Sequence, residues 1–272
     1  MTFAERYGPW AVVAGASEGL GEALVRGCAA RGLNVVLIAR RVELAQRLAD
    51  DIAAEAGVQT RAMRADLAVR GDLDRILADL ADLDVGLFIY NAAFSVVGPF
   101  WNFDVDTHLK EIDVNVRGPL VLSHGFGERF RAQRRGGLIL LSSMGALQGM
   151  MRVANYSATK AYNLVLAEGL WAELREDGVD VLVSCAGATR TPNYVASEPA
   201  DGHVPVQEPE QVANETLNAL GKQPTLFPAR VLRLTHFAFR HLMGRRNAVR
   251  LMAYASERTY KEQDSYNTGD RK

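Results

Sequence analysis

Residues 10–21, WAVVAGASEGLG, decide the fold of this chain. The stretch begins with five apolar residues, which favour a buried strand, and continues into a loop with glycines at 15, 19 and 21. Glycine permits a tight turn and a close approach of the backbone to a phosphate group, and a helix N-terminus supplies free N–H groups. The stretch therefore predicts a strand, a phosphate-binding loop and a helix.

The same alternation continues along the chain. Apolar runs predict strands at 10–14, 34–39, 58–65, 84–90, 137–141, 179–185 and 225–227. The segments between them have helical periodicity, with long helices expected at 105–131 and 155–176. Short apolar strands that alternate with helices imply a parallel sheet covered on both faces. We therefore expect one α/β domain, a doubly wound Rossmann-type sheet of about seven strands.

The chain has no visible second domain. Residues 1–228 are expected to form the dinucleotide-binding and catalytic domain. Within it, residues 191–207 contain three prolines and little periodicity, which is typical of a surface loop. Residues 229–272 are expected to be a C-terminal helical extension of the same domain, which is helical, basic and apolar to residue 260 and ends in a frayed tail. The extension would close over a pocket, contact another subunit or lie on a membrane surface.

Composition and charge exclude several classes of protein. The net charge is -1, which gives no electrostatic footprint for nucleic acid. No run reaches the ~18 apolar residues of a membrane span, and residues 1–10 do not form a signal peptide. Cys28 and Cys185 lie far apart, and the chain has no CxxC or HExxH motif. We therefore expect a cytoplasmic protein with reduced thiols and no metal site.

The glycine loop has a competing interpretation. Residues 15–19 also fit G-x-S-x-G, the nucleophile elbow of serine hydrolases, with Ser17 as the nucleophile. An elbow nucleophile usually follows a strand in the middle of the sheet, whereas Ser17 follows the first strand. The later histidines His203, His236 and His241 lie in segments without clear periodicity. The serine hydrolase is therefore the alternative and not the leading hypothesis.

The end of the second strand predicts the cofactor. In NAD-binding α/β folds an acidic residue there binds the ribose 2′-hydroxyl group. Here the strand ends in Arg40 and Arg41, whose guanidinium groups suit a 2′-phosphate. We therefore expect NADP(H), the alternative being two solvated arginines at a helix start. Asp66 and Leu67 follow the third strand, where the carboxylate suits either the adenine amino group or a helix N-cap.

Four further residues form a candidate catalytic set. Tyr156 and Lys160 are four residues apart on an expected helix and share a face. Ser143 follows the fifth strand, and Asn115 lies in the long helix before it. Hydride delivery to a carbonyl makes an alkoxide that must be protonated, and a nearby ammonium lowers the pKa of a tyrosine from its ordinary ~10. Each residue has an ordinary structural explanation alone, but together they indicate carbonyl reduction.

With these residues in this order, the sequence resembles the short-chain dehydrogenase/reductase family over about residues 8–228. The resemblance implies that Tyr156 is the general acid/base and that Ser143 hydrogen-bonds the substrate oxygen. It implies that Lys160 binds the nicotinamide ribose and helps to ionise Tyr156, and that Asn115 organises a water in a proton relay. The cofactor-binding residues expected from the loop and the resemblance are Gly15, Ser17, Glu18, Gly19, Leu20, Gly21, Arg40, Arg41, Asp66, Leu67, Asn91, Ala92, Tyr156, Lys160, Gly187, Thr189 and Thr191.

Two positions depart from the family pattern. Residues 90–93 read Tyr-Asn-Ala-Ala where the family has Asn-Asn-Ala-Gly, and residues 186–187 read Ala-Gly where it has Pro-Gly. Both changes affect the expected cofactor floor and substrate loop and leave the four catalytic positions intact. A non-catalytic NADP-sensing protein is a third hypothesis, which the intact catalytic set argues against. The family also implies a homodimer or homotetramer through the helices at 105–131 and 155–176.

Within the family, residues 5–10, 39–41 and 187–192 resemble bacterial 7-beta-hydroxysteroid dehydrogenases. We therefore expect a bulky lipophilic ketone or alcohol, with a hydroxysteroid as the leading candidate. The apolar residues expected near the site are Phe94, Val96, Val97, Phe100, Trp101, Met144, Leu147, Met150, Met151, Tyr194 and Val195. Such residues suit a ligand pocket, the alternative being that they pack the loops or a subunit contact.

Overall fold

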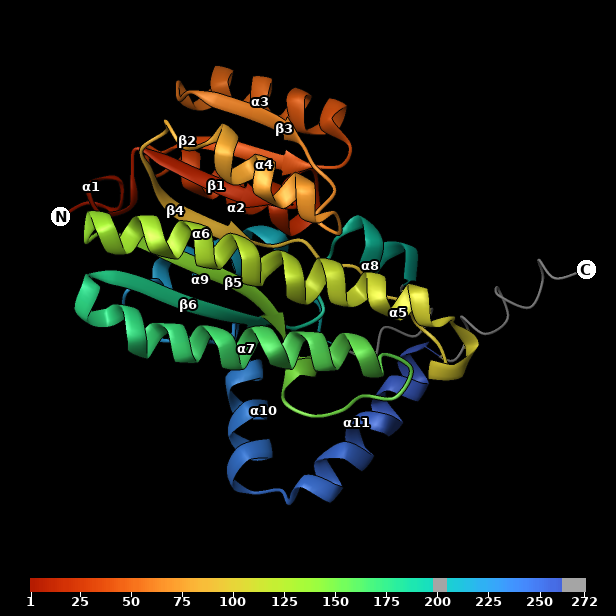
Figure 1. Ribbon diagram of the computed structural model, residues 1–272. Coiled ribbons are helices and arrows are strands. Elements are labelled where there is room, and N and C mark those ends of the chain that lie inside the picture. The colour runs from red at the N-terminus through yellow and green to blue at the C-terminus, as the bar shows by residue number, and fades with distance from the viewer. Residues whose placement is uncertain (198–204, 261–272) are drawn as a thin grey trace, which may run out of the picture.

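A computed structural model describes residues 1–197 and 205–260 (Figure 1). Its centre is a seven-stranded sheet in the order β3-β2-β1-β4-β5-β6-β7, in which every pairing is parallel. The strands are β1 (Trp10–Ala14), β2 (Asn34–Ala39), β3 (Thr60–Arg64), β4 (Val85–Tyr90), β5 (Gly136–Ser143), β6 (Val179–Ala186) and β7 (Thr225–Leu226). The predicted fold class and strand count are confirmed.

Helices cover both faces of the sheet. Helices α2 (Gly19–Ala29), α3 (Val42–Ala56) and α9 (Pro209–Ala219) contribute to one core cluster. Helices α4 (Arg70–Asp79), α6 (Gly118–Gln133) and α7 (Ala154–Leu174) contribute to the other. The remaining helical segments are α1 (Phe3–Tyr7), η1 (Phe100–Asn102), α5 (Val105–Ile112), η2 (Asp113–Arg117), η3 (Met144–Ala146), η4 (Arg175–Asp177), α8 (Pro192–Ser197), α10 (Arg230–His241) and α11 (Arg245–Tyr260).

The apolar runs of the sequence are explained by this double cover. In β1, Ala11 and Val13 belong to the core cluster under α2, whereas Val12 and Ala14 belong to the cluster under α6. All four side chains are fully buried. A strand in the middle of a parallel sheet needs apolar residues at every position, because successive side chains point to opposite faces.

The long helix predicted at 105–131 is present, but it is not α-helical throughout. The segment contains α5, the π-helical turn η2 and α6. Pro119 has no N–H group, so it cannot donate the α-helical bond to the carbonyl of Asn115. The helix widens around this position, and the N–H group of Gly118 donates to the carbonyl of Asp113 instead. A π-helical turn of this kind changes the direction in which the following side chains point.

The C-terminal extension is helical over most of residues 229–260, as predicted. It consists of two helices, α10 and α11, separated at residues 242–244 by a turn that contains Gly244. Figure 1 shows them as two arms of a V below the sheet. The surface loop predicted at 191–207 begins with α8, its residues 198–204 lie outside the described part, and so does the predicted frayed tail at 261–272. In the described part, no helix is long and apolar enough to cross a membrane.

Candidate active site

A cleft of about 710 Å³ opens at the carboxyl ends of the strands. The cleft lies across the boundary between β1 and β4, where the strand order reverses. Doubly wound folds bind their ligands at this boundary. Of the sequence-predicted site residues, the cleft is lined by Gly15, Ser17, Glu18, Leu20, Arg40, Arg41, Asp66, Leu67, Asn91, Ala92, Ser143, Tyr156, Lys160, Gly187, Thr189 and Thr191. Gly19, Gly21 and Asn115 do not line the cleft, but each contacts a residue that does.

The glycine loop is held tightly against the sheet. Gly15 has φ +82°, a backbone conformation that favours glycine. Its carbonyl oxygen accepts a hydrogen bond of 2.7 Å from Nδ2 of Asn91. A Cβ atom on Gly21 would lie 2.0 Å from the same oxygen, so helix α2 can approach the loop only with glycine there.

The N-terminus of α2 is suited to an anion. The helix begins at Gly19 beside the cleft, and no side chain caps it. The first N–H groups of a helix have no partner within the helix, and the helix dipole makes this end positive. The loop and helix start therefore fit the pyrophosphate of a dinucleotide.

The end of β2 differs from the expectation in one respect. Arg40 and Arg41 are exposed and line the cleft, as the NADP(H) prediction requires. However, Nη2 of Arg41 lies 2.5 Å from Oε1 of Glu18. The glycine loop therefore places a carboxylate at the end of β2, although β2 itself does not end in an acidic residue. Sequence reasoning missed this contact, because the direction of the Glu18 side chain is not encoded in its position in the loop.

Asp66 closes a turn after β3. Its Oδ1 atom accepts a hydrogen bond of 3.0 Å from the N–H group of Ala68, and its own N–H group donates to Oδ2 of Asp72 at 2.6 Å. Helix α4 begins at Arg70 with Val69 as its N-cap, so the helix-cap alternative for Asp66 is wrong. The residue lines the cleft, and its contact with an adenine amino group remains a prediction.

Ser143, Tyr156 and Lys160 meet at the floor of the cleft. Ser143 ends β5, and its Oγ atom accepts a hydrogen bond of 3.1 Å from the N–H group of Gly145. The Lys160 Nζ atom donates to the carbonyl of Leu141 at 2.9 Å and lies 5.6 Å from the ring centroid of Tyr156. Burial lowers the pKa of Lys160 to about 8, since the charged form loses solvation.

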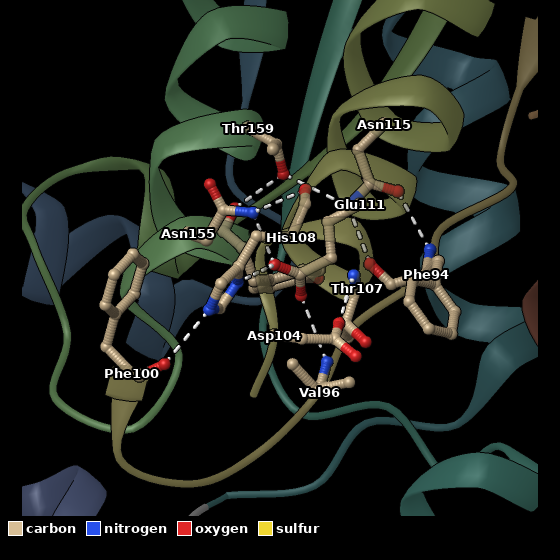
Figure 2. Close-up of polar contacts among 11 residues, drawn as sticks. Phe94, Val96, Phe100, Asp104, Thr107, His108, Glu111, Asn115, Asn155 and Thr159 are labelled. Carbon is tan, nitrogen blue, oxygen red and sulfur yellow. Dashed lines mark hydrogen bonds and ion pairs between the residues drawn. The ribbon is translucent and has the colours of Figure 1, made fainter. Parts of the chain in front are cut away.

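Asn115 lies behind this floor and is fully buried. Its Oδ1 atom accepts from the N–H group of Phe94 at 2.8 Å, while Nδ2 donates to the Phe94 carbonyl at 2.7 Å and to Oγ1 of Thr159 at 3.1 Å (Figure 2). Thr159 Oγ1 in turn donates to the carbonyl of Tyr156 at 2.7 Å. The amide therefore links the segment after β4 to helix α7, and its water-relay role remains a prediction.

Gly187, Thr189 and Thr191 form the wall after β6. Oγ1 of Thr189 donates to the Gly187 carbonyl at 3.1 Å, and the Thr191 N–H group donates to the Thr189 carbonyl at 2.7 Å. A Cβ atom on Gly19 would lie 3.0 Å from Cγ2 of Thr191, so this wall packs against the start of α2. The two parts of the expected cofactor site are therefore in contact.

The far wall of the cleft is apolar. Among the apolar residues expected near the site, Phe94, Val97, Met144, Met150 and Tyr194 line the cleft. The C-terminal helices α10 and α11 also line it, through residues that sequence reasoning did not name: Val231, Leu232, Thr235, Phe239, Met252, Ala255 and Ser256. Of the three roles expected for the C-terminal extension, closing over a pocket is the one that these contacts favour. Helical periodicity alone could not show which of its faces turns inward.

The described residues offer neither a metal site nor a hydrolase base. In the ranges 1–197 and 205–260, no group of three or more His, Cys, Asp or Glu side chains could hold a metal ion. No histidine of these ranges lines the cleft beside Ser17. His203 lies outside the described residues.

Comparison with known proteins gives one family and related activities. The short chain dehydrogenase family matches residues 9–201. A 7beta-hydroxysteroid dehydrogenase of Clostridium sardiniense is 33% identical over 227 residues, which cover 83% of this chain and 87% of that protein. A solved structure from work on 7beta-hydroxysteroid dehydrogenase stereoselectivity has a TM-score of 0.88 at 31% identity and covers 93% of this chain and 99% of its own. A short-chain dehydrogenase from Sphingobium yanoikuyae, solved in complex with NADPH, has a TM-score of 0.76 at 26% identity, with coverages of 86% and 94%.

Proposed function

Because the chain belongs to the short chain dehydrogenase family and is therefore an oxidoreductase, we propose that it transfers a hydride between NADP(H) and a bulky lipophilic ketone or secondary alcohol. A hydroxysteroid is the leading substrate. The observation that carries the proposal is the single cleft in which Ser143, Tyr156 and Lys160 lie between a glycine loop and an apolar wall.

The chain's own residues hold the substrate oxygen and move a proton. A bound nicotinamide supplies or accepts the hydride, which is chemistry that no side chain provides. The Tyr156 hydroxyl gives its proton to the developing alkoxide, and Ser143 Oγ donates a hydrogen bond to the same oxygen. The ammonium group of Lys160 stabilises the negative charge that remains on Tyr156, and it would also hold the nicotinamide ribose.

The preference for NADP(H) is supported by the end of β2. Arg40 and Arg41 both line the cleft there, and guanidinium groups bind phosphate through charge-assisted hydrogen bonds. The structural relative in complex with NADPH supports the same choice. A 2′-phosphate would compete with Glu18 for Arg41, since that carboxylate already pairs with it.

A bulky lipophilic substrate is supported by the shape and lining of the cleft. The volume of about 710 Å³ is in the range of pockets for drug-sized ligands, which are mostly apolar with a few polar groups. Met144, Met150 and Met252 line it, and methionine adapts to irregular ligand shapes. The 7beta-hydroxysteroid dehydrogenase of Clostridium sardiniense supports a steroid as the first substrate to try.

We further propose a cytoplasmic homodimer or homotetramer. Cys28 and Cys185 are buried free thiols, which fits a reducing compartment. On the helices expected to form the contact, the exposed apolar side chains are Val105, Leu109, Ile112, Leu120 and Val165. Clusters of exposed apolar residues mark sites of association, and most soluble oligomers are closed and symmetric.

The test is a competition of substrates in one NADPH absorbance assay. Oxo-steroids should give a clearly higher kcat/KM than small ketones such as acetoin. A p-nitrophenyl ester in a parallel assay tests the hydrolase at Ser17, and NADPH binding without turnover of any carbonyl would identify a sensor. If small polar carbonyls are preferred, the steroid proposal is wrong although the reductase stands.

A further inference from the structure

One face of α5 and the π-helical turn after it is joined to the segment that follows β4. His108, Glu111 and Asn115 are three and four residues apart, so their side chains lie on one side of this helix. Their partners run in the opposite order along residues 94–100, as Figure 2 shows. His108 Nε2 lies 3.0 Å from the Phe100 carbonyl, Glu111 Oε1 accepts from the Val96 N–H group at 3.0 Å, and Asn115 bonds both backbone groups of Phe94.

The same side of α5 also contacts the first turns of α7, which carry Tyr156. Nδ2 of Asn155 donates to Oε2 of Glu111 at 2.6 Å and to the His108 carbonyl at 3.0 Å. Asn115 makes the corresponding contact with Thr159. The two contacts therefore lie one residue before Tyr156 and three residues after it.

Glu111 is a charged residue in a buried position, with 1% of its surface exposed. A buried carboxylate is costly unless hydrogen bonds satisfy it. Here each oxygen accepts from a different element, Oε1 from the segment after β4 and Oε2 from α7. Nδ1 of His108 lies 3.6 Å from Oε2, within ion-pair distance but beyond a hydrogen bond. Glu111 therefore connects both elements through one carboxylate group, as Asn115 does through its amide.

The arrangement requires a carboxylate. A glutamine has one acceptor oxygen and one donor nitrogen, whereas Val96 and Asn155 both present N–H groups to Glu111. Asn155 cannot reverse its amide to compensate, because its oxygen would then face the carbonyl of His108. One donor would remain unpaired in a buried place, which is the costly outcome.

We propose that Glu111 is a positioning residue that fixes the substrate wall relative to Tyr156. Phe94 and Val97 line the cleft on either side of Val96, the residue that Glu111 holds. Movement of this segment would change how a ketone lies against the Tyr156 hydroxyl, while the glycine loop and β2 would keep their contacts. The inference rests on the proposed function, in which Tyr156 is the acid and this wall contacts the substrate.

The test is Glu111→Gln in the full chain. We expect kcat/KM for the best ketone to fall about tenfold or more, chiefly through a higher KM, because a charge-assisted hydrogen bond is lost. The Kd of NADPH, measured by fluorescence titration, should stay within about twofold of wild type, since no cofactor contact changes. Amide hydrogen exchange at residues 94–100 should become faster.

A matched control is Thr216→Val, which removes a buried hydrogen bond of 2.8 Å to Ser184 outside the cleft. It should lower Tm without changing the ratio between the ketone KM and the NADPH Kd. Asn155→Ser is a second variant for use if the glutamine variant does not fold. It cuts only the contact with α7, and it should change the ketone KM in the same direction.

The outcomes separate this inference from the proposed function. If wild type reduces a ketone and both variants keep its kcat/KM, the positioning role is wrong and the reductase stands. Loss of NADPH affinity in parallel with ketone turnover would also overturn it, because that pattern indicates general damage. If wild type reduces no carbonyl, the proposed function fails, and hydrogen exchange still tests whether Glu111 holds residues 94–100 in place. Unchanged exchange at these residues in Glu111→Gln would then refute the positioning role of Glu111.

Discussion

Lys160 carries a measurable stability cost that depends on pH. Burial lowers the pKa of its ammonium group from 10.5 to about 8. Between these values the unfolded chain binds a proton at Lys160 that the folded chain has released. The stability of the fold therefore rises with pH through this window, and the full cost of the buried charge is present below pH 8. The shift corresponds to about 3 kcal/mol at neutral pH.

Lys160→Met isolates this cost, because methionine has a similar length and does not titrate. The variant leaves the Leu141 carbonyl without its 2.9 Å donor, but that loss does not depend on pH. The unfolding free energy of wild type minus that of the variant should therefore rise by about 2.5 kcal/mol from pH 7 to pH 10. Groups that do not interact with Lys160 titrate alike in both proteins and cancel. Tyr156 does interact with Lys160, so both proteins are measured in a Tyr156→Phe background, which removes its titration.

The assay is urea unfolding of both proteins at pH 7, 8, 9 and 10, at one protein concentration and without cofactor. Lys160→Arg is a useful comparison, since arginine stays charged throughout this pH range. The unfolding free energy of Lys160→Arg minus that of Lys160→Met should therefore not rise from pH 7 to pH 10. A difference between wild type and Lys160→Met that is flat from pH 7 to pH 10 would refute the reasoning. It would mean that the ammonium is solvated in the folded state.

Four other outcomes are expected. Tyr156→Phe should lower ketone turnover by about 10²–10⁴ while NADPH titration remains normal, and near wild-type turnover would contradict its role as the acid. Replacing Arg40 and Arg41 with alanine should weaken NADPH roughly tenfold or more and spare NADH, so equal losses would exclude a 2′-phosphate contact. Glu18→Gln should tighten NADPH several-fold in the same titration, by about the strength of an exposed ion pair, and weaker binding would show that the carboxylate aids the site. Light scattering at micromolar concentration should give a dimer or tetramer, and a monomer would defeat the oligomer proposal.

The sheet and much of the site could be predicted because they depend on local patterns. Strands β1 and β2 occupy the predicted residues. A short apolar run between two turns marks the bounds of a strand when helices cover both faces of the sheet. The glycine loop lines one cleft with Ser143, Tyr156 and Lys160, because the loop and Ser143 both follow parallel strands, whose carboxyl ends lie at one edge of the sheet. Chain order and strand direction were sufficient for that result.

The remaining features depend on side-chain direction or on single backbone groups. The π-helical turn after α5 follows from the missing N–H group of Pro119, which a pattern of apolar residues does not reveal. Glu111 looks like a solvated residue on an amphipathic helix, and its burial becomes visible only once Val96 and Asn155 are packed around it. The pairing of Glu18 with Arg41 likewise joins two segments whose distance the sequence does not give.

The π-helical turn at η2 affects where this segment of the chain can lose a residue. Each residue of an α-helix advances the side-chain direction by about 100°. The π-helical turn holds one residue more than an α-helical turn, so a gene that lost one codon between residues 113 and 117 would encode an ordinary α-helical turn at this place. Leu122, Phe126 and Phe130 would then stay buried against the sheet. A codon lost within α6 would instead rotate the side chains that follow by about 100°, so deletions should disturb the fold less at residues 113–117 than further along the helix.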